Sequence, residues 1–330
     1  MGLLSNKNEE ARKAVHNVLV NYLQANDCRR LWCFTDNKRK WLAENFIEVG
    51  RELGLRTYLT TFSEIKYTDQ DIEPIKELLN KIDEDDLMIS IFSHDISKVF
   101  PTFKVFPVLK APKDFKGKSA SIRSHFPDQL FAKRLLTPLE TVEETVAQVG
   151  NYQSGDRLRV TAPAGTDLTF ELKNGKTLPY KIDDNSNHAY LPASEVTYGI
   201  KPGTARGKIV VDVTVGEFVV KGQLVDQLGE VDSPVTLTVE DGYITGIEGQ
   251  DIAGRLETCF EEMEEKARLV VELGFGLSTG QPFGWAGTDE ILQGTCHFGI
   301  GNDFFYGGNN DVPMHLDVII QSPEIEELKK

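Results

Sequence analysis

The sequence predicts an α/β domain with a mainly parallel sheet over residues 1–150, followed by a β-rich α+β domain over residues 151–330. Three observations support this prediction. A chain of 330 residues is too long for most domains with a single hydrophobic core, so two domains are expected. In the first half, short apolar runs alternate with amphipathic helical segments. In the second half, alternating polar and apolar residues are interrupted by glycine-containing turns, a pattern typical of antiparallel strands.

The first half is expected to begin with a helix over residues 8–25, where apolar side chains recur at helical spacing. Strands are expected from Leu31, over residues 55–62 and from Asp86, separated by helices over residues 38–54 and 71–82. This order predicts a parallel sheet. No glycine-rich dinucleotide fingerprint follows the first strand, so a nucleotide site is not supported. His94 follows the third strand, where such sheets bind ligands, and is a candidate substrate contact.

The second half changes character from about Asp156, where polar and apolar residues begin to alternate. The dipeptides Asn174–Gly175 and Asp241–Gly242 predict tight turns between antiparallel strands. One helical segment, expected over residues 253–274 and closed by Gly274, interrupts the strands. His188 lies in a polar stretch that is expected to form a solvated loop.

Charge and composition exclude several classes of protein. The formal net charge is -15, whereas binding to nucleic acid or to an anionic membrane requires a basic face. No segment is apolar and long enough for a signal peptide or a membrane span. The four cysteines form no C-x-x-C pair, and we expect them to be reduced thiols. The sequence therefore predicts an acidic cytoplasmic enzyme.

Five residues of metal-ligand type stand in glycine-rich or apolar contexts in the second half. They are Glu195, Glu272, His297, His315 and Asp317. If MHLDVII forms a strand, its H-x-D spacing places both polar side chains on one face. Glu272 is expected at the C-terminal end of a helix, where negative charge is unfavourable and a bound cation would compensate it.

Carboxylates and imidazoles are the ligands expected for zinc, cobalt, manganese or iron. A lone H-x-D is as well explained by a structural pair, but five such residues are too many for one tetrahedral ion. With one carboxylate bridging, they suit two divalent ions held a few Å apart.

The segments GTDLTF, LPASEV, ELGFGLSTG, GTCHFGIGNDFFYGGNND and PMHLD resemble the aminopeptidase T and aminopeptidase S family of metallopeptidases. The resemblance covers most of residues 156–320 in motif order. It implies a homodimeric enzyme with a C-terminal catalytic domain that binds two divalent ions, Zn, Co or Mn. It places the ligands on the five residues named above, and it implies that a metal-activated water cleaves the amide bond of a small peptide or small amide.

The resemblance has departures that keep other functions open. Phe304 stands where the family has a tyrosine, and Tyr306 is the nearest hydroxyl that would replace it in catalysis. Glu195 is a second candidate catalytic residue, as a carrier of the proton. The same superfamily includes 2,5-dihydroxypyridine dioxygenases, in which His297, His315 and Asp317 would hold one Fe(II). A third alternative is a metal-stabilised binding protein without catalytic activity.

Overall fold

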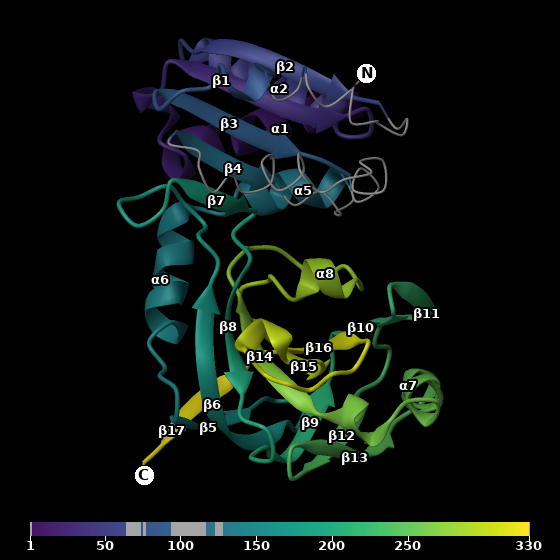
Figure 1. Ribbon diagram of the computed structural model, residues 1–330. Coiled ribbons are helices and arrows are strands. Elements are labelled where there is room, and N and C mark those ends of the chain that lie inside the picture. Colours follow the sequence, from purple (N-terminus) through teal and green to yellow (C-terminus); the bar gives the residue numbers. More distant parts are fainter. Residues whose placement is uncertain (1, 64–73, 75–76, 94–116, 123–127, 330) are drawn as a thin grey trace. The chain divides into compact units, whose positions relative to one another are not determined.

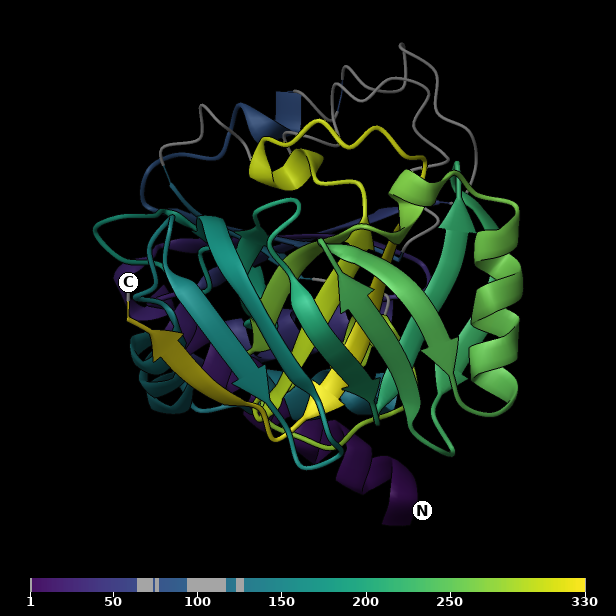
Figure 2. The same ribbon diagram turned by 90° about the horizontal axis from the view of Figure 1, so that it is seen from below.

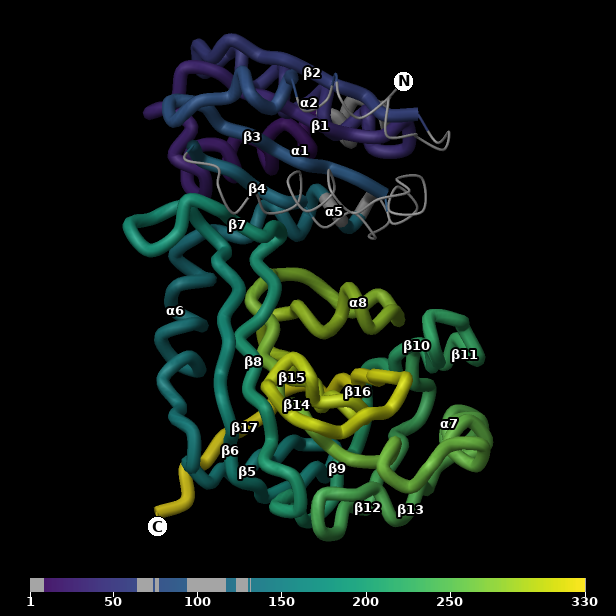
Figure 3. Tube along the Cα trace, viewed as in Figure 1, coloured from purple at the N-terminus to yellow at the C-terminus, as the bar shows by residue number. Residues whose placement is uncertain are grey.

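The computed structural model describes residues 2–63, 74, 77–93, 117–122 and 128–329. Contacts divide the chain into two compact units, each built from two segments. The first unit contains residues 1–142 and 178–193, and the second contains residues 143–177 and 194–330. The first change of unit lies near the boundary expected after residue 150. The return of residues 178–193 to the first unit was not expected from the sequence (Figure 3).

Five parallel strands form the sheet of the first unit, in the order β2-β1-β3-β4-β7 (Figure 1). The strands are β1 (Arg30–Asp36), β2 (Arg56–Phe62), β3 (Asp86–Ile91), β4 (Lys118–Ile122) and β7 (His188–Leu191). β1 and β3 are buried along almost their whole length, as expected of parallel strands covered on both faces. The predicted α/β domain with a parallel sheet is confirmed.

The helices of the first unit pack on one another and on this sheet. They are α1 (Gly2–Asn17), the short η1 (Val18–Tyr22) and η2 (Ala25–Asp27), α2 (Lys40–Glu52) and α5 (Asp128–Leu135). α1 packs against α2 and α5, and α2 packs against β1 and β2. Of the helix expected over residues 71–82, residues 74 and 77–79 are helical and residues 80–82 are not, while residues 71–73 and 75–76 lie outside the described residues. His94 also lies outside them.

His188 belongs to strand β7 and not to the solvated loop that the sequence predicted. β7 pairs with β4, and this pairing brings the Nδ1 atom of His188 within 2.8 Å of the Ser119 hydroxyl. The ring of Tyr190 lies edge-on to the imidazole, with 4.7 Å between ring centroids. Burial lowers the pKa of His188 from 6.5 to about 4, because it disfavours the charged imidazolium.

This lowered pKa predicts a loss of stability in mild acid. The folded protein resists protonation of His188, whereas the unfolded chain accepts the proton near pH 6.5. The full stability of the folded protein is present above pH 6.5, where His188 is neutral in both states. Stability is then lost as the pH falls from 6.5 towards 4, because only the unfolded chain binds the proton in this range. Between pH 7.5 and pH 5 we expect this group to cost about 2 kcal/mol in the free energy of unfolding. Urea titrations at both pH values should show this difference reduced in His188→Gln, and an unchanged difference would contradict the assignment.

Twelve strands form the sheet of the second unit, and every pair of neighbours is antiparallel (Figure 2). The main path runs β11-β10-β16-β15-β14-β8-β6-β9-β12-β13, and β5 pairs with β6 and β17. The bounds are β5 (Arg157–Thr161), β6 (Asp167–Thr177), β8 (Glu195–Ile200), β9 (Arg206–Val211), β10 (Thr214–Val220), β11 (Gln223–Glu230), β12 (Val235–Glu240), β13 (Tyr243–Glu248), β14 (Val270–Gly276), β15 (Thr295–Gly301), β16 (His315–Gln321) and β17 (Glu324–Leu328).

The two dipeptides that predicted tight turns behave differently. Asp241 and Gly242 both have positive φ and join β12 to β13, as expected. Asn174 and Gly175 do not form a turn, because β6 continues through them to Thr177. Gly175 allows close approach instead, since a Cβ there would lie 2.5 Å from the ring of Tyr198 on the paired strand β8.

The helices of this unit are α6 (Leu139–Val149), which begins at the end of the first unit, α7 (Asp251–Glu261), η4 (Glu265–Arg268), α8 (Ala286–Asp289) and η5 (Phe304–Tyr306). α7 packs against β11, β12 and β13. The expected helix over residues 253–274 is wrong beyond Glu261, because strand β14 begins at Val270. Two β-branched valines open this strand, and pairing with β8 and β15 on its two sides outweighs local helix propensity. No described helix is long and apolar enough to cross a bilayer.

Candidate metal centre

Four neighbouring strands of the second unit carry all five residues expected to bind metal. In sheet order, β16 carries His315 and Asp317, β15 carries His297, β14 carries Glu272, and β8 begins at Glu195. Glu272 and Asp317 both pair with Gly299 of the strand between them. Because side chains alternate between the faces of a sheet, this register places the five side chains on one face.

Glycines occupy the positions beside these side chains on the same face. In β14 the order is Glu272-x-Gly274-x-Gly276, and in β15 it is His297-x-Gly299-x-Gly301. A Cβ on Gly274 would lie 2.1 Å from the His297 imidazole. A Cβ on Gly299 would lie 2.7 Å from Nε2 of His315 and from Cβ of Glu272. Gly274 and Gly299 therefore leave the space into which candidate ligands from the neighbouring strands extend.

These glycines were missed as functional residues in the sequence, although their signal was present. The alternations E-x-G-x-G and H-x-G-x-G have the period of a strand face. The first alternation was not recognised as part of a strand, because a helix was expected over residues 253–274. The assignment of Glu272 to a helix C-terminus is therefore wrong, and the unfavourable helix dipole invoked there plays no part.

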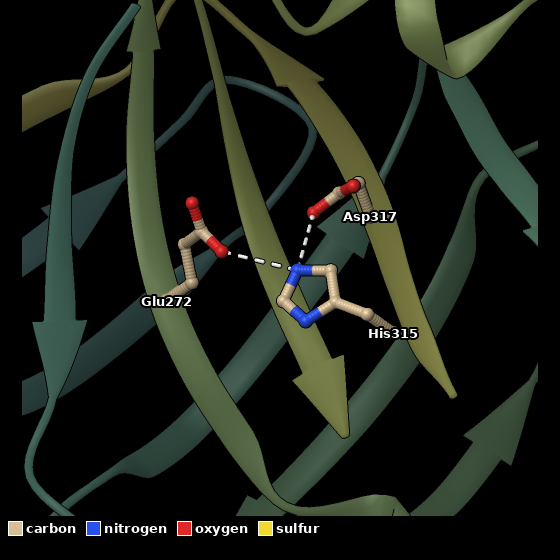
Figure 4. Close-up of side chains that lie close together, drawn as sticks. All are labelled: Glu272, His315 and Asp317. Atoms are coloured by element: carbon tan, nitrogen blue, oxygen red, sulfur yellow. Dashed lines mark ion pairs between the residues drawn. The ribbon is translucent and has the colours of Figure 1, made fainter. Parts of the chain in front are cut away.

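Glu272 is the central residue of the cluster. Its Oε2 atom lies 3.0 Å from Nε2 of His315, and its Oε1 atom lies 3.7 Å from Nε2 of His297. His315 Nε2 is also 3.3 Å from Oδ1 of Asp317 (Figure 4). His297 Nε2 is also 3.6 Å from Oε2 of Glu195. The two oxygens of one carboxylate are thus directed to two imidazoles, and each imidazole has a second carboxylate beside it.

The charges of these groups are strongly coupled. Burial raises the pKa of Glu272, but the hydrogen bonds and charges of His297 and His315 outweigh burial and hold that pKa below its usual range. Burial lowers the pKa of His297, but Glu272, Glu195 and Asp317 together raise it to about 10. The pKa of His315 is raised for the same reason, chiefly by Asp317. The carboxylates therefore favour positive charge at this point of the sheet.

Tyr306 reaches this cluster although it lies two positions beyond the expected tyrosine position. Its hydroxyl donates a 2.5 Å hydrogen bond to Oε1 of Glu272. Burial, followed by the charge of Glu272, raises the pKa of Tyr306, so the hydroxyl stays protonated. The ring lies on Gly199, where a Cβ would approach within 2.8 Å. Phe304, by contrast, is 54% exposed.

The donor set suits divalent cations. One oxygen or nitrogen atom from each of Glu272, His315 and Asp317 lies within 4.8 Å of the others. Among the described residues, no Lys or Arg pairs with Glu272 or Asp317, so imidazoles are their cationic neighbours. A mixture of nitrogen and carboxylate oxygen donors at buried and half-buried positions is typical of zinc, cobalt, manganese or iron sites. The residues present therefore fit a metal centre.

Comparisons with solved structures show a shared fold. A solved structure of 2,5-dihydroxypyridine dioxygenase from Pseudomonas putida KT2440 is similar over 97% of this chain and 94% of that one, with 16% identity and a TM-score of 0.62. Wild-type AmpT from Thermus thermophilus is similar over 97% and 95%, with 14% identity and a TM-score of 0.54. No curated protein matches the sequence significantly.

These similarities support the shared fold of the superfamily, and they do not single out the aminopeptidase T family to which the motifs were compared. The model of one family matches residues 124–326, which is more than half of the chain. That segment includes all five metal-ligand candidates and Tyr306. The chain belongs to the family described as NicX, 2,5-dihydroxypyridine 5,6-dioxygenase.

Proposed function

We propose that this protein is a metal-dependent hydrolase of the aminopeptidase type, which cleaves the amide bond of a small peptide. One observation carries the proposal: the two oxygens of Glu272 are directed to two different imidazoles. A carboxylate placed in this way could serve two divalent ions, and paired ions are typical of hydrolytic metalloenzymes. The resemblance of the site motifs to aminopeptidases T and S supports the same choice.

The five residues divide into two groups around the bridge. Glu195 and His297 with Oε1 of Glu272 form one group, and His315 and Asp317 with Oε2 form the other. Two divalent ions bound there would supply a polarised substrate carbonyl and a water of lowered pKa. Three carboxylates and two imidazoles make the groups suitable for Zn, Co or Mn.

The chain's own residues then orient the substrate and the proton. Glu195 is at the edge of the cluster, with its side chain 15% exposed, and is the candidate to receive a proton and pass it on. Tyr306 holds Oε1 of Glu272 through its hydroxyl and keeps the carboxylate in its bridging orientation.

A second candidate is a ring-cleaving dioxygenase with one Fe(II). The match to the dioxygenase family and the TM-score of 0.62 to a solved dioxygenase favour it. The triad expected for this function is His297, His315 and Asp317, whereas the compact group in the structure is Glu272, His315 and Asp317, which could hold a single ion. In that case His297 and Glu195 would form a pair beside the centre, 3.6 Å apart.

Metal content and two activity assays separate these functions. We expect the purified protein to bind about two ions per chain and, after removal and restoration of Zn, Co or Mn, to hydrolyse aminoacyl-p-nitroanilides. One iron per chain with oxygen uptake on 2,5-dihydroxypyridine would establish the dioxygenase instead. Tight metal binding with neither activity would support a metal-stabilised binding protein.

Tyr306→Phe tests the role of the hydroxyl. We expect kcat to fall about 10- to 100-fold, because one charge-assisted hydrogen bond is lost. Metal affinity should fall by no more than about 10- to 100-fold, because Tyr306 orients Glu272 and is not itself a candidate ligand, so kcat is compared at saturating metal. Phe304→Tyr should have wild-type activity, because its side chain is exposed. Rescue of Tyr306→Phe by Phe304→Tyr in the double variant would assign the role to position 304 and contradict this view.

A further inference from the structure

Lys176 lies on the strand next to the metal centre, in register with it. On β6 it pairs with Thr197 of β8, Thr197 pairs with Gly274 of β14, and Gly274 pairs with His297 of β15. Residues paired in this way point to the same face of a sheet. Lys176 and His297 therefore lie on the same face of the sheet, in one row across four strands, with Thr197 and Gly274 between them.

The ammonium group of Lys176 contacts the segment that carries Tyr306. It lies 3.7 Å from the ring centroid of Phe305 and 5.9 Å from that of Tyr306, and it donates a hydrogen bond to the Phe305 carbonyl. The hydroxyl end of the same tyrosine is bonded to Glu272. The Tyr306 side chain thus has the Lys176 ammonium near its ring and the central carboxylate of the metal centre at its hydroxyl.

The charge of Lys176 is not neutralised by a carboxylate among the described residues. Neighbouring lysines differ in this respect: Lys173 lies 3.8 Å from Asp303, and Lys201 lies 2.7 Å from Glu171. An ammonium group has three donors, and the Phe305 carbonyl takes one of them. Lys176 is exposed, so the remaining donors are accessible to a ligand.

We propose that Lys176 binds the free carboxylate of the substrate and selects dipeptide-sized substrates, an inference that rests on the proposed hydrolase. In an extended peptide, one residue spans about 3.5 Å. The carboxylate of a dipeptide therefore lies one residue beyond the scissile carbonyl, and in the proposed complex it points towards the strand that carries Lys176. Longer peptides, amides and esters place no charge there. A protein with a net charge of -15 would otherwise repel an anionic substrate.

The test compares alanyl-alanine with alanyl-alaninamide, which differ only in the terminal charge. For Lys176→Gln in the metal-loaded protein, we expect KM for the dipeptide to rise about 10- to 100-fold, as for loss of a hydrogen bond to a charged group. KM for the amide should change less than about threefold. Lys176→Arg should restore part of the preference, and the control Lys201→Gln should leave both substrates unaffected.

Equal losses on both substrates would overturn the proposal and would show that Lys176 only holds the loop through Phe305. If the wild-type protein hydrolyses neither compound, the hydrolase proposal fails, and equilibrium binding of the same two compounds is measured by calorimetry. A preference for the dipeptide that Lys176→Gln abolishes would still support a carboxylate site. No preference in the wild-type protein would refute it.

Discussion

Glu272→Gln is expected to reduce metal affinity by at least about 100-fold, since even residues that only orient a ligand are worth 10- to 100-fold. The substitution keeps the shape of the side chain but removes the negative charge and one acceptor oxygen. Both imidazoles then lose the carboxylate that lies between them. Metal content after dialysis against a weak chelator measures the effect directly.

The matched control is Glu248→Gln at the exposed end of β13. It removes the same charge from the same sheet and should leave metal affinity unchanged. Retention of wild-type affinity by Glu272→Gln would contradict the bridging role. Retention of one ion with loss of the other would show that the two groups bind independently.

Gly274→Ala is expected to disable the centre without altering any ligand. The new methyl group would lie 2.1 Å from the buried imidazole of His297, so the ring must leave its position. Crowding of this kind costs about 1–3 kcal/mol in the free energy of unfolding. Metal binding should fall about as far as in a variant that lacks His297, and calorimetric titration with zinc provides the measurement.

Gly254→Ala is the control for this change. Gly254 lies in helix α7, and a Cβ there meets no atom within 4 Å. Alanine should stabilise the helix by about 0.5–1 kcal/mol and leave metal binding intact. The two substitutions are chemically identical, so opposite effects on stability separate steric displacement of His297 from a general effect of the methyl group.

The fold was largely predictable where local pattern and tertiary environment agree. Continuous apolar runs such as β1 indicated the parallel sheet, and Asp241–Gly242 indicated a hairpin. Prediction failed where sheet pairing overrides local preference. Residues 265–274 resemble the continuation of a helix, yet neighbours on both sides make residues 270–276 a strand. Asn174–Gly175 resembles a turn, yet Gly175 serves close packing against Tyr198.

The candidate ligand residues could be selected from the sequence because imidazoles and carboxylates in glycine-rich contexts are conspicuous there. Their distances were not, since these depend on the register of four strands that are distant in the chain. Tyr306 shows the same limit. It lies two positions beyond the family tyrosine, and the sequence does not show that its hydroxyl contacts Glu272, as it does in the structure. Lys176 carries no sequence signal at all, because its neighbour Thr197 is brought beside it only by strand pairing.

The return of residues 178–193 to the first unit has a consequence for synthesis of the protein. A ribosome that has completed residue 150 has released only four strands of the parallel sheet, because β7 ends at Leu191. The edge of β4 that receives β7 stays open while β5 and β6 are being made. A single cut between residues 142 and 178 therefore separates β7 from the rest of its sheet. The N-terminal half then has an unpaired edge at β4, and the C-terminal half carries β7 without its partner. Unpaired strand edges of this kind promote aggregation.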